Sequence, residues 1–233
     1  MGLRIRREFA TGLRAAVPVM LGYLPIAFSF GLAAHGAGLP AWTAALMSAL
    51  VYTGAGQFAA LGMLGAGAPL PEIVLAVLFM NLRHVVLNLA LLPRLKPQSL
   101  WRRAVVAMGV TDETFAVAAF SHDPALTRLP GLVGLNCGAW LSWSLGTLLG
   151  GWAALLVPRA VNDAMAVMLY GLFIGLLVPV VRKAPRGLLV ALAAMAIHVA
   201  CGRLMAPGWA LVCAIVAGAA VIWLLPERRG ETL

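Results

Sequence analysis

Hydrophobic segments follow one another along almost the whole chain, each close to the length that crosses a lipid bilayer. A membrane-spanning helix needs about 20 mostly apolar residues. Such segments cover residues 13–34, 41–65, 71–92, 104–120, 131–157, 163–181, 187–204 and 207–225. Little of the 233-residue chain remains for a soluble domain. The chain is therefore predicted to be one polytopic membrane domain over residues 1–233, surrounded by the lipid bilayer.

The composition supports this class, because 62% of the residues are hydrophobic and only 11% are charged. That leaves too little polar surface to coat a soluble globule of this size. The segments are continuously apolar, whereas the strands of a membrane barrel alternate apolar and polar residues. We therefore predict an all-α fold with six to eight full spans.

The basic residues lie in short runs beside the hydrophobic segments. A net charge of +9 would suggest a nucleic-acid partner for a soluble protein, but in a membrane protein this arrangement is the positive-inside pattern. It places the basic N-terminus, residues 1–12, and the tail, residues 226–233, in the cytoplasm. The apolar run after Arg14 is too long for a signal peptide. No nucleic-acid partner is predicted.

Loop charges also bear on how the second and fourth segments cross. If all eight segments spanned the membrane, the basic cluster from Arg94 to Arg103 would lie on the wrong side for the positive-inside rule. If residues 41–65 and 104–120 entered and left on the same side, that conflict would disappear. We therefore predict discontinuous helices in these two segments.

Residues 52–58 in the second segment read Y-T-G-A-G-Q-F. Glycine at two alternate positions, Gly54 and Gly56, beside Tyr52 and Gln57 indicates a helix that breaks and exposes backbone N–H and C=O groups. Such breaks are where transporters bind zwitterions and ions. The alternative interpretation is close helix packing through small residues.

The third segment places Asn81, Arg83, His84 and Asn88 in an apolar run. An ionised side chain near the bilayer centre costs at least about 2.5–3.5 kcal/mol, so a partner, a water-filled cavity or a function must offset it. Helical periodicity places Asn81, His84 and Asn88 on one face, as in a cavity lining, and Arg83 on nearly the opposite side. Arg83 therefore needs an acidic partner or a ligand carboxylate, unless its side chain reaches the interface. His84 is either a proton carrier or a satisfied buried residue.

The fourth segment carries two adjacent carboxylates, Asp112 and Glu113, well inside an apolar run. Desolvation and like-charge repulsion both disfavour double ionisation of such a pair. The two residues are therefore candidates for proton coupling or for binding an ammonium group. A structural salt bridge to Arg83 is the alternative, and both interpretations hold together if one acid pairs while the other titrates.

The first segment contains Pro18, Gly22 and Pro25. Proline removes a backbone donor and disturbs the helix one turn before it. The segment is therefore either a kinked helix adapted to close packing or a hinge beside a substrate path.

Enzymatic chemistry is not indicated by the sequence. The four histidines are scattered, and neither H-E-x-x-H nor G-x-S-x-G occurs. The three cysteines are odd in number and lie in apolar surroundings, which is typical of buried thiols. We predict no enzyme activity, no cofactor and no metal.

Four motifs, G-Y-L-P at 22–25, Y-T-G-A-G-Q-F at 52–58, N-L-R-H at 81–84 and T-D-E-T-F-A at 111–116, follow in this order. Together they resemble the AzlC family, the large subunit of bacterial branched-chain amino acid exporters. The resemblance implies a multi-pass exporter of leucine, isoleucine and valine in the bacterial inner membrane. It also implies a small AzlD-type membrane subunit as partner and use of the proton gradient.

An amino acid needs one site for its carboxylate, one for its ammonium group and an apolar pocket for its side chain. N–H groups around Gly54 and Gly56, with Gln57 and help from Arg83, are predicted to hold the carboxylate. The ammonium group is assigned to Asp112 or Glu113. An apolar pocket discriminates one methylene by roughly 1–3 kcal/mol, so methionine is an expected overlapping substrate.

The remaining predicted site residues complete this assignment. Substrate contacts are also predicted for Tyr52, Asn81 and Asn88, and proton coupling for His84 together with the two acids. The alternative function is a channel, or an accessory membrane subunit without carrier activity of its own.

Overall fold

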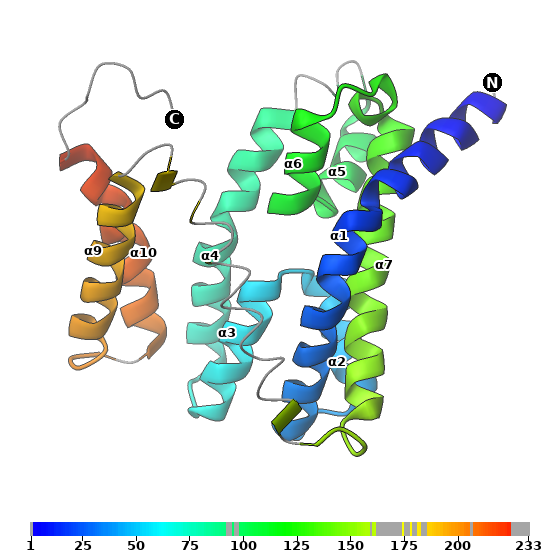
Figure 1. The fold of residues 1–233 in the computed structure, drawn as a ribbon. Coiled ribbons are helices and arrows are strands. Elements are labelled where there is room, and N and C mark those ends of the chain that lie inside the picture. Colours follow the sequence, from blue (N-terminus) through cyan, green and yellow to red (C-terminus); the bar gives the residue numbers. More distant parts are fainter. Residues whose placement is uncertain are drawn as a thin grey trace. The chain divides into compact units, whose positions relative to one another are not determined.

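The computed structural model describes residues 2–91, 95, 98–158, 160, 161, 174, 178, 181, 182, 186–205 and 207–224. No strand occurs among these residues. Their elements are α1 (Gly2–Gly36), α2 (Ala41–Val51), α3 (Gly54–Gly65), α4 (Leu70–Leu91), α5 (Leu100–Met108), α6 (Asp112–Phe120), the 3-10 turn η2 (Pro124–Thr127), α7 (Leu129–Ala153), α9 (Arg186–Cys201) and α10 (Pro207–Leu224) (Figure 1). The all-α prediction is confirmed. The predicted tail 226–233 and most of the predicted segment 163–181 lie outside the described residues.

Three of the described helices, α1, α4 and α7, are long and apolar enough to cross a membrane. They contain 35, 22 and 25 residues. Shorter apolar helices lie at Ala41–Val51, Gly187–Cys201 and Trp209–Gly218. The prediction of a helical membrane protein is therefore confirmed, and the number of full spans stays a prediction.

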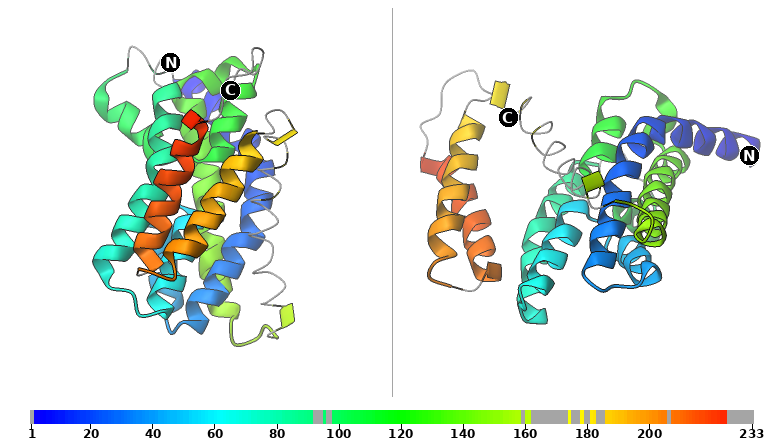
Figure 2. Two further views of the ribbon diagram at one scale, coloured as in Figure 1. Left: turned by 90° about the vertical axis from the view of Figure 1, so that its left-hand side faces the viewer. Right: turned by 60° about the horizontal axis from the view of Figure 1, so that its bottom comes forward.

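The chain forms two compact units, Met1–Gln57 with Asn81–Ala166 and Phe58–Met80 with Val167–Leu233. Every predicted site residue lies in the first unit. In the second unit α9 and α10 pack against each other (Figure 2). Their backbones approach closely at Gly218, where a Cβ atom would lie 2.6 Å from the Cβ of Ala194.

In the first unit, α1 and α7 run in parallel with their backbones in contact. A Cβ atom at Gly12 would lie 1.9 Å from the carbonyl oxygen of Gly131, and one at Gly31 would lie 2.1 Å from that of Thr147. Residue numbers rise together on both helices, which fixes the parallel direction that Figure 1 shows. Glycines on both sides allow this approach, as in membrane helix pairs generally.

α1 continues through Pro18 and Pro25 without ending. Figure 1 shows it changing direction along its length, as expected where proline removes a helical hydrogen bond. The kink is therefore present, whereas the predicted hinge role of Pro18, Gly22 and Pro25 stays a prediction.

The second predicted segment is broken, as the pattern of glycines predicts. α2 ends at Val51 and α3 begins at Gly54. Between them Tyr52 adopts a left-handed backbone with φ 45°. It is the only residue other than glycine with a positive φ in the described part of the chain.

The fourth predicted segment is also broken, between α5 and α6. Thr111 caps the second half: its hydroxyl accepts from the Thr114 N–H, and the Thr114 hydroxyl accepts from the Thr111 N–H. This reciprocal cap starts a helix firmly after a non-helical residue. Figure 1 shows the two halves running in opposite directions, as a segment that enters and leaves on one side requires.

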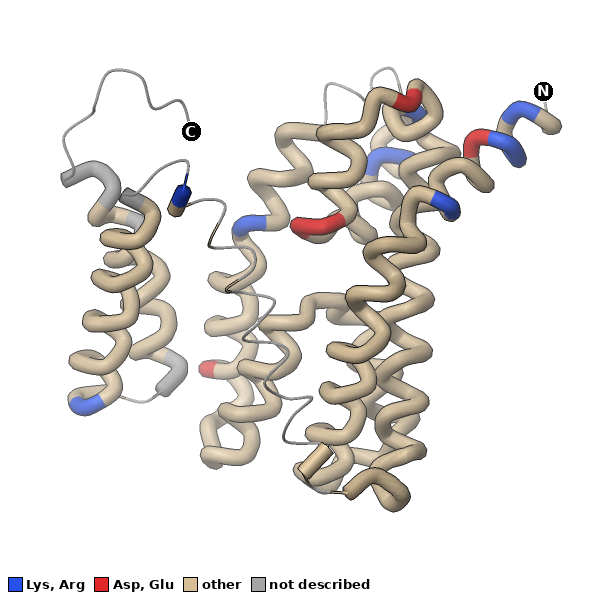
Figure 3. The backbone as a smooth tube through the Cα atoms, in the orientation of Figure 1, with Lys and Arg blue, Asp and Glu red and all other residues tan. Residues whose placement is uncertain are grey.

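A hydrophobic cluster holds this broken segment against its neighbours. Its members come from α1, α4, α5, α6, α7 and the connections between them: Ala16, Leu91, Leu95, Val106, Val110, Ala118, Leu126, Leu132 and Leu135. Charged residues of the first unit gather toward the end that carries the chain's N-terminus (Figure 3). The sequences of α2 and α7 contain no charged residue.

Candidate functional site

An ion pair joins the third and fourth predicted segments. The Arg83 Nη1 on α4 lies 2.8 Å from the Asp112 Oδ2 in the first turn of α6. The two side chains keep 40% and 30% of their surface exposed. The structure therefore gives Arg83 the acidic partner that its apolar surroundings call for, and it selects Asp112 of the two acids.

Glu113 has a different environment. The Tyr23 hydroxyl on α1 lies 2.5 Å from the Glu113 Oε2 and 2.7 Å from the Thr111 Oγ1. Tyr23 is itself fixed by Trp143 on α7, with ring centroids 5.3 Å apart in an edge-to-face arrangement. Among the described residues Glu113 forms no ion pair. The two adjacent acids thus have different partners: Asp112 pairs with the Arg83 guanidinium, and Glu113 accepts from the Tyr23 phenol.

The break between α2 and α3 is held by Gln57, whose side chain is fully buried. Its Oε1 accepts from the Trp143 Nε1 at 2.9 Å and from the Thr53 N–H at 3.3 Å. Its Nε2 donates to the Ser48 Oγ at 2.8 Å. The amide is therefore engaged with the protein, and the predicted contact with a substrate carboxylate would require these hydrogen bonds to open.

The same network continues onto α7. The Ser48 and Thr147 hydroxyls lie 2.7 Å apart, and Thr147 donates to the Trp143 carbonyl at 3.0 Å. A Cβ atom at Gly54 would lie 2.9 Å from the Trp143 ring. Glycine is thus needed here for the approach of an aromatic ring, and Gly54 belongs to the packing of the break as well as to its exposed N–H groups.

Tyr52 is a buried side chain with a free hydroxyl. Only 7% of its surface is exposed, and the hydroxyl has no hydrogen-bond partner among the described residues. It lies within electrostatic reach of Glu113 and Tyr23. Buried hydroxyls are normally hydrogen-bonded, so Tyr52 is an exception in the described part of the chain, together with Ser29 and Ser144. Its predicted contact with the substrate stays a prediction.

The asparagines of α4 and α7 secure the broken segments. Thr53 donates to the Asn81 Oδ1 at 2.8 Å. The Asn88 Nδ2 donates to the Ala107 carbonyl at 3.2 Å, and the Asn136 Nδ2 donates to the Val106 carbonyl at 2.9 Å. These two carbonyls also accept from the N–H groups of Gly109 and Val110 at the end of α5, so both amides add a second hydrogen bond there.

The structure therefore divides the predicted site residues into two groups. Arg83, Asp112, Glu113 and Tyr52 gather with half-buried His84, which interacts electrostatically with Arg83 and both acids. The predicted residues that instead hold helices together are Gln57, Asn81 and Asn88. Gly56 is buried in the first turn of α3, where N–H groups have no acceptor within the helix.

Sequence reasoning missed Tyr23 and Thr111 as site residues. Tyr23 belongs to the G-Y-L-P motif and Thr111 opens the T-D-E-T-F-A motif. A hydroxyl in an apolar helix does not by itself indicate which residue it will bind. The signal that could have identified these two residues was their place in the two motifs.

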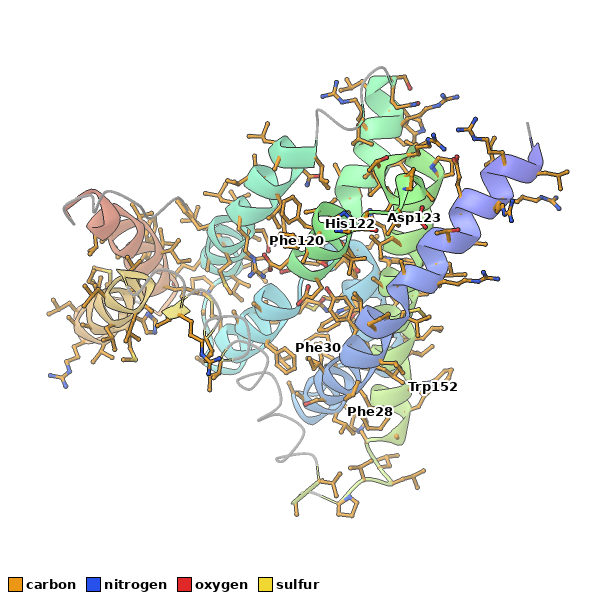
Figure 4. All side chains as sticks on the ribbon, turned by 45° about the horizontal axis from the view of Figure 1, so that its top comes forward. Phe28, Phe30, Phe120, His122, Asp123 and Trp152 are labelled. Atoms are coloured by element: carbon orange, nitrogen blue, oxygen red, sulfur yellow. The ribbon has the colours of Figure 1, made fainter. Side chains whose placement is uncertain are left out.

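Other polar and aromatic residues lie away from the Arg83–Asp112 pair. His122 and Asp123 lie in the connection after α6, near Phe120, while Phe28, Phe30 and Trp152 lie toward the other end of α1 and α7 (Figure 4). The described residues include no group of three histidine, cysteine or acidic side chains that could hold a metal ion. Cys137, Cys201 and Cys213 are free thiols.

The family model described as AzlC protein matches residues 18–157. This range contains both broken segments, the ion pair and Tyr23. No solved structure matches the chain.

Several relatives are membrane proteins. The chain is 33% identical to the inner membrane protein YgaZ of Escherichia coli over 72% of this chain and 71% of that protein. It is 34% identical to a protein of Archaeoglobus fulgidus, described as an uncharacterized membrane protein, over 73% of this chain and 75% of that one. It is 24% identical to the branched-chain amino acid transport protein AzlC of Bacillus subtilis over 52% of this chain and 48% of that one.

Proposed function

Since the chain belongs to the AzlC family of membrane transport proteins, we propose that it is a secondary transporter that exports branched-chain amino acids. Leucine, isoleucine and valine are its substrates, with methionine as an overlapping one. The name of the Bacillus subtilis relative supports this substrate class. Export proceeds across the bacterial inner membrane, and the name of the Escherichia coli relative supports that location.

The observation that carries the proposal is the Arg83–Asp112 ion pair with Glu113 beside it. A zwitterionic amino acid presents one negative and one positive group, and this cluster offers a partner for each. Ionisable residues inside a membrane segment are costly and mark transport pathways. Their position at the end of a broken helix is the arrangement that secondary transporters use for charged substrates.

The carboxylate is bound by Arg83 and by the exposed N–H groups in the first turn of α3, near Gly54 and Gly56. The helix dipole adds a partial positive charge at that end. The ammonium group is bound by Glu113 with the Tyr52 hydroxyl. The aliphatic side chain occupies apolar surroundings, which every helix of the first unit can supply.

The transport cycle uses the proton gradient and a small AzlD-type membrane subunit. Glu113, which has no cation as partner among the described residues, supports proton coupling. The basic run at Arg4, Arg6 and Arg7 supports a cytoplasmic N-terminus. The family resemblance supports the second subunit.

Reconstitution into liposomes, with and without the small subunit, tests the function. Labelled leucine should show saturable counterflow, and Arg83→Ala and Asp112→Asn should abolish it. Arg102→Ala is the matched control, since Arg102 is exposed and donates only to Gln98 among its described hydrogen bonds. Non-saturable flux would show a channel, and flux that requires the second protein would show half of a transporter.

A further inference from the structure

We propose that the two adjacent acids have separate roles: Asp112 stays ionised in its pair with Arg83, and Glu113 is the single position that a proton and the substrate ammonium group occupy in turn. One proton is therefore exchanged for each amino acid. This inference rests on the proposed transport function and adds to it the coupling residue and the stoichiometry.

In the described part of the chain, the charged groups around Glu113 leave its carboxylate without a cation. The charged and titratable groups that face it among the described residues are Tyr23 of α1, Tyr52 after α2, Arg83 and His84 of α4, and Asp112 of its own helix. Arg83 lies 2.8 Å from Asp112, and no ion pair joins it to Glu113 among the described residues. Glu113 therefore has no cation of its own, and either one proton or one ammonium group can neutralise its carboxylate.

A hydrogen bond from the Tyr23 hydroxyl holds the Glu113 carboxylate. An oxygen–oxygen distance of 2.5 Å is the length of an O–H group that donates to a carboxylate. A phenol both donates and accepts, so Tyr23 can donate to the carboxylate and accept from the protonated acid. Tyr23 therefore positions Glu113 in both protonation states, and Trp143 fixes the ring that does so.

The Tyr52 hydroxyl is a further observation, separate from the hydrogen bond of Tyr23. The Tyr52 side chain is more than nine-tenths buried, its hydroxyl has no hydrogen-bond partner among the described residues, and it interacts electrostatically with Glu113. A bound proton gives the Glu113 carboxyl group a single O–H donor, and Tyr23 is the acceptor for that donor. An ammonium group has three N–H donors, so it can bind Glu113 and still donate to Tyr52. Tyr52 thus recognises the amino acid and not the proton.

The chemistry of the exchange is one acid–base step. The only bond formed is the O–H bond of the Glu113 carboxyl group, with a proton taken from water on one side. That bond breaks when the ammonium group binds, and the proton leaves to water on the other side. The amino acid is a neutral zwitterion, so each cycle moves one positive charge opposite to the amino acid.

The test is proton release on leucine binding by the purified full-length chain, with its small subunit where binding requires it. Binding is measured with labelled leucine, and protons are measured with an indicator dye in weak buffer across a pH series. The maximum release should be one proton per leucine bound. Glu113→Gln should lose the release and Glu113→Asp should retain it.

Two hydroxyl variants separate the roles further. Tyr52→Phe should weaken leucine binding about tenfold and keep the maximum release of one proton. Tyr23→Phe should shift the pH at which half of the release occurs. A purely structural role for Tyr23 would lower folded yield without that shift.

The outcomes are distinguishable. Absence of leucine binding by the wild-type complex would refute the transport function itself. Leucine binding with no proton or two protons released, or full release by Glu113→Gln, would leave the transport function standing and overturn this inference. The wild-type stoichiometry decides the question even if a variant fails to fold.

Discussion

Gln57 offers the sharpest test of how the break between α2 and α3 is held. Replacing it by leucine keeps the side-chain size and removes three hydrogen bonds, to Ser48, Trp143 and the Thr53 N–H. Ser48 keeps Thr147 at 2.7 Å, whereas the Trp143 Nε1–H loses its acceptor. An unsatisfied buried donor costs about 1–3 kcal/mol, and each lost hydrogen bond about 1 kcal/mol. With the Trp143 donor left unsatisfied and two other hydrogen bonds lost, Gln57→Leu should therefore lower the free energy of unfolding by about 3–5 kcal/mol.

The assay is equilibrium unfolding in mixed micelles, with Gln98→Leu as the matched control. Gln98 lies in the connection before α5 and accepts only from the exposed Arg102 among its described contacts, so its replacement should cost under about 0.5 kcal/mol. Trp143→Phe removes the same N–H group from the other side. In that background Gln57→Leu should cost about 1–2 kcal/mol less.

Equal destabilisation by the two glutamine variants would refute this reasoning. So would full additivity of Gln57→Leu and Trp143→Phe. Either result would mean that Gln57 is not held by the protein, and its predicted role as a substrate ligand would regain support.

Three further predictions concern the scaffold. Gly150→Ala should lower the midpoint of thermal unfolding by several degrees, because the added Cβ would lie 2.0 Å from the Phe28 carbonyl oxygen. Gly62→Ala is the control and should leave the midpoint unchanged, since Gly62 has open space around it. Equal midpoints of the two variants in detergent would contradict this prediction. Thr111→Ala should cost about 1 kcal/mol through the lost cap, and Thr111→Ser should restore most of it in the same unfolding assay; no recovery would show that the cap is not the cause. A cysteine at Gln98, in a background without the native cysteines, should react with an impermeant reagent from the same side as the N-terminus; labelling from the opposite side would exclude the re-entrant segment.

Much of the first unit could be predicted because its irregularities are visible in composition. Gly54 and Gly56 weaken a helix whatever surrounds it, and Asp112 and Glu113 are costly in any apolar run. These local penalties identify the breaks without knowledge of the tertiary structure. The ion pair to Arg83 followed for the same reason, since a lone guanidinium in lipid needs a partner.

The roles of individual polar groups could not be predicted in this way. Gln57 resembles a ligand-binding residue in sequence and is instead hydrogen-bonded to Ser48 and Trp143, which lie far away along the chain. Adjacent acids differ by about 100° in direction on a helix, and only the positions of α1 and α4 decide which acid meets Tyr23 and which meets Arg83. Long-range contacts, not local pattern, assign these roles.

The glycine contacts between α1 and α7 limit how this protein can move. At Gly12, Gly31, Gly134 and Gly150 the two backbones touch directly, which leaves little room for one helix to slide along the other, so the two helices should move together. Tyr23 and Trp143 lie on this helix pair and should therefore keep their spacing. In the proposed transport cycle, the rearrangement that turns Glu113 from one aqueous compartment to the other would then fall to the half-helices that meet at Tyr52 and Thr111.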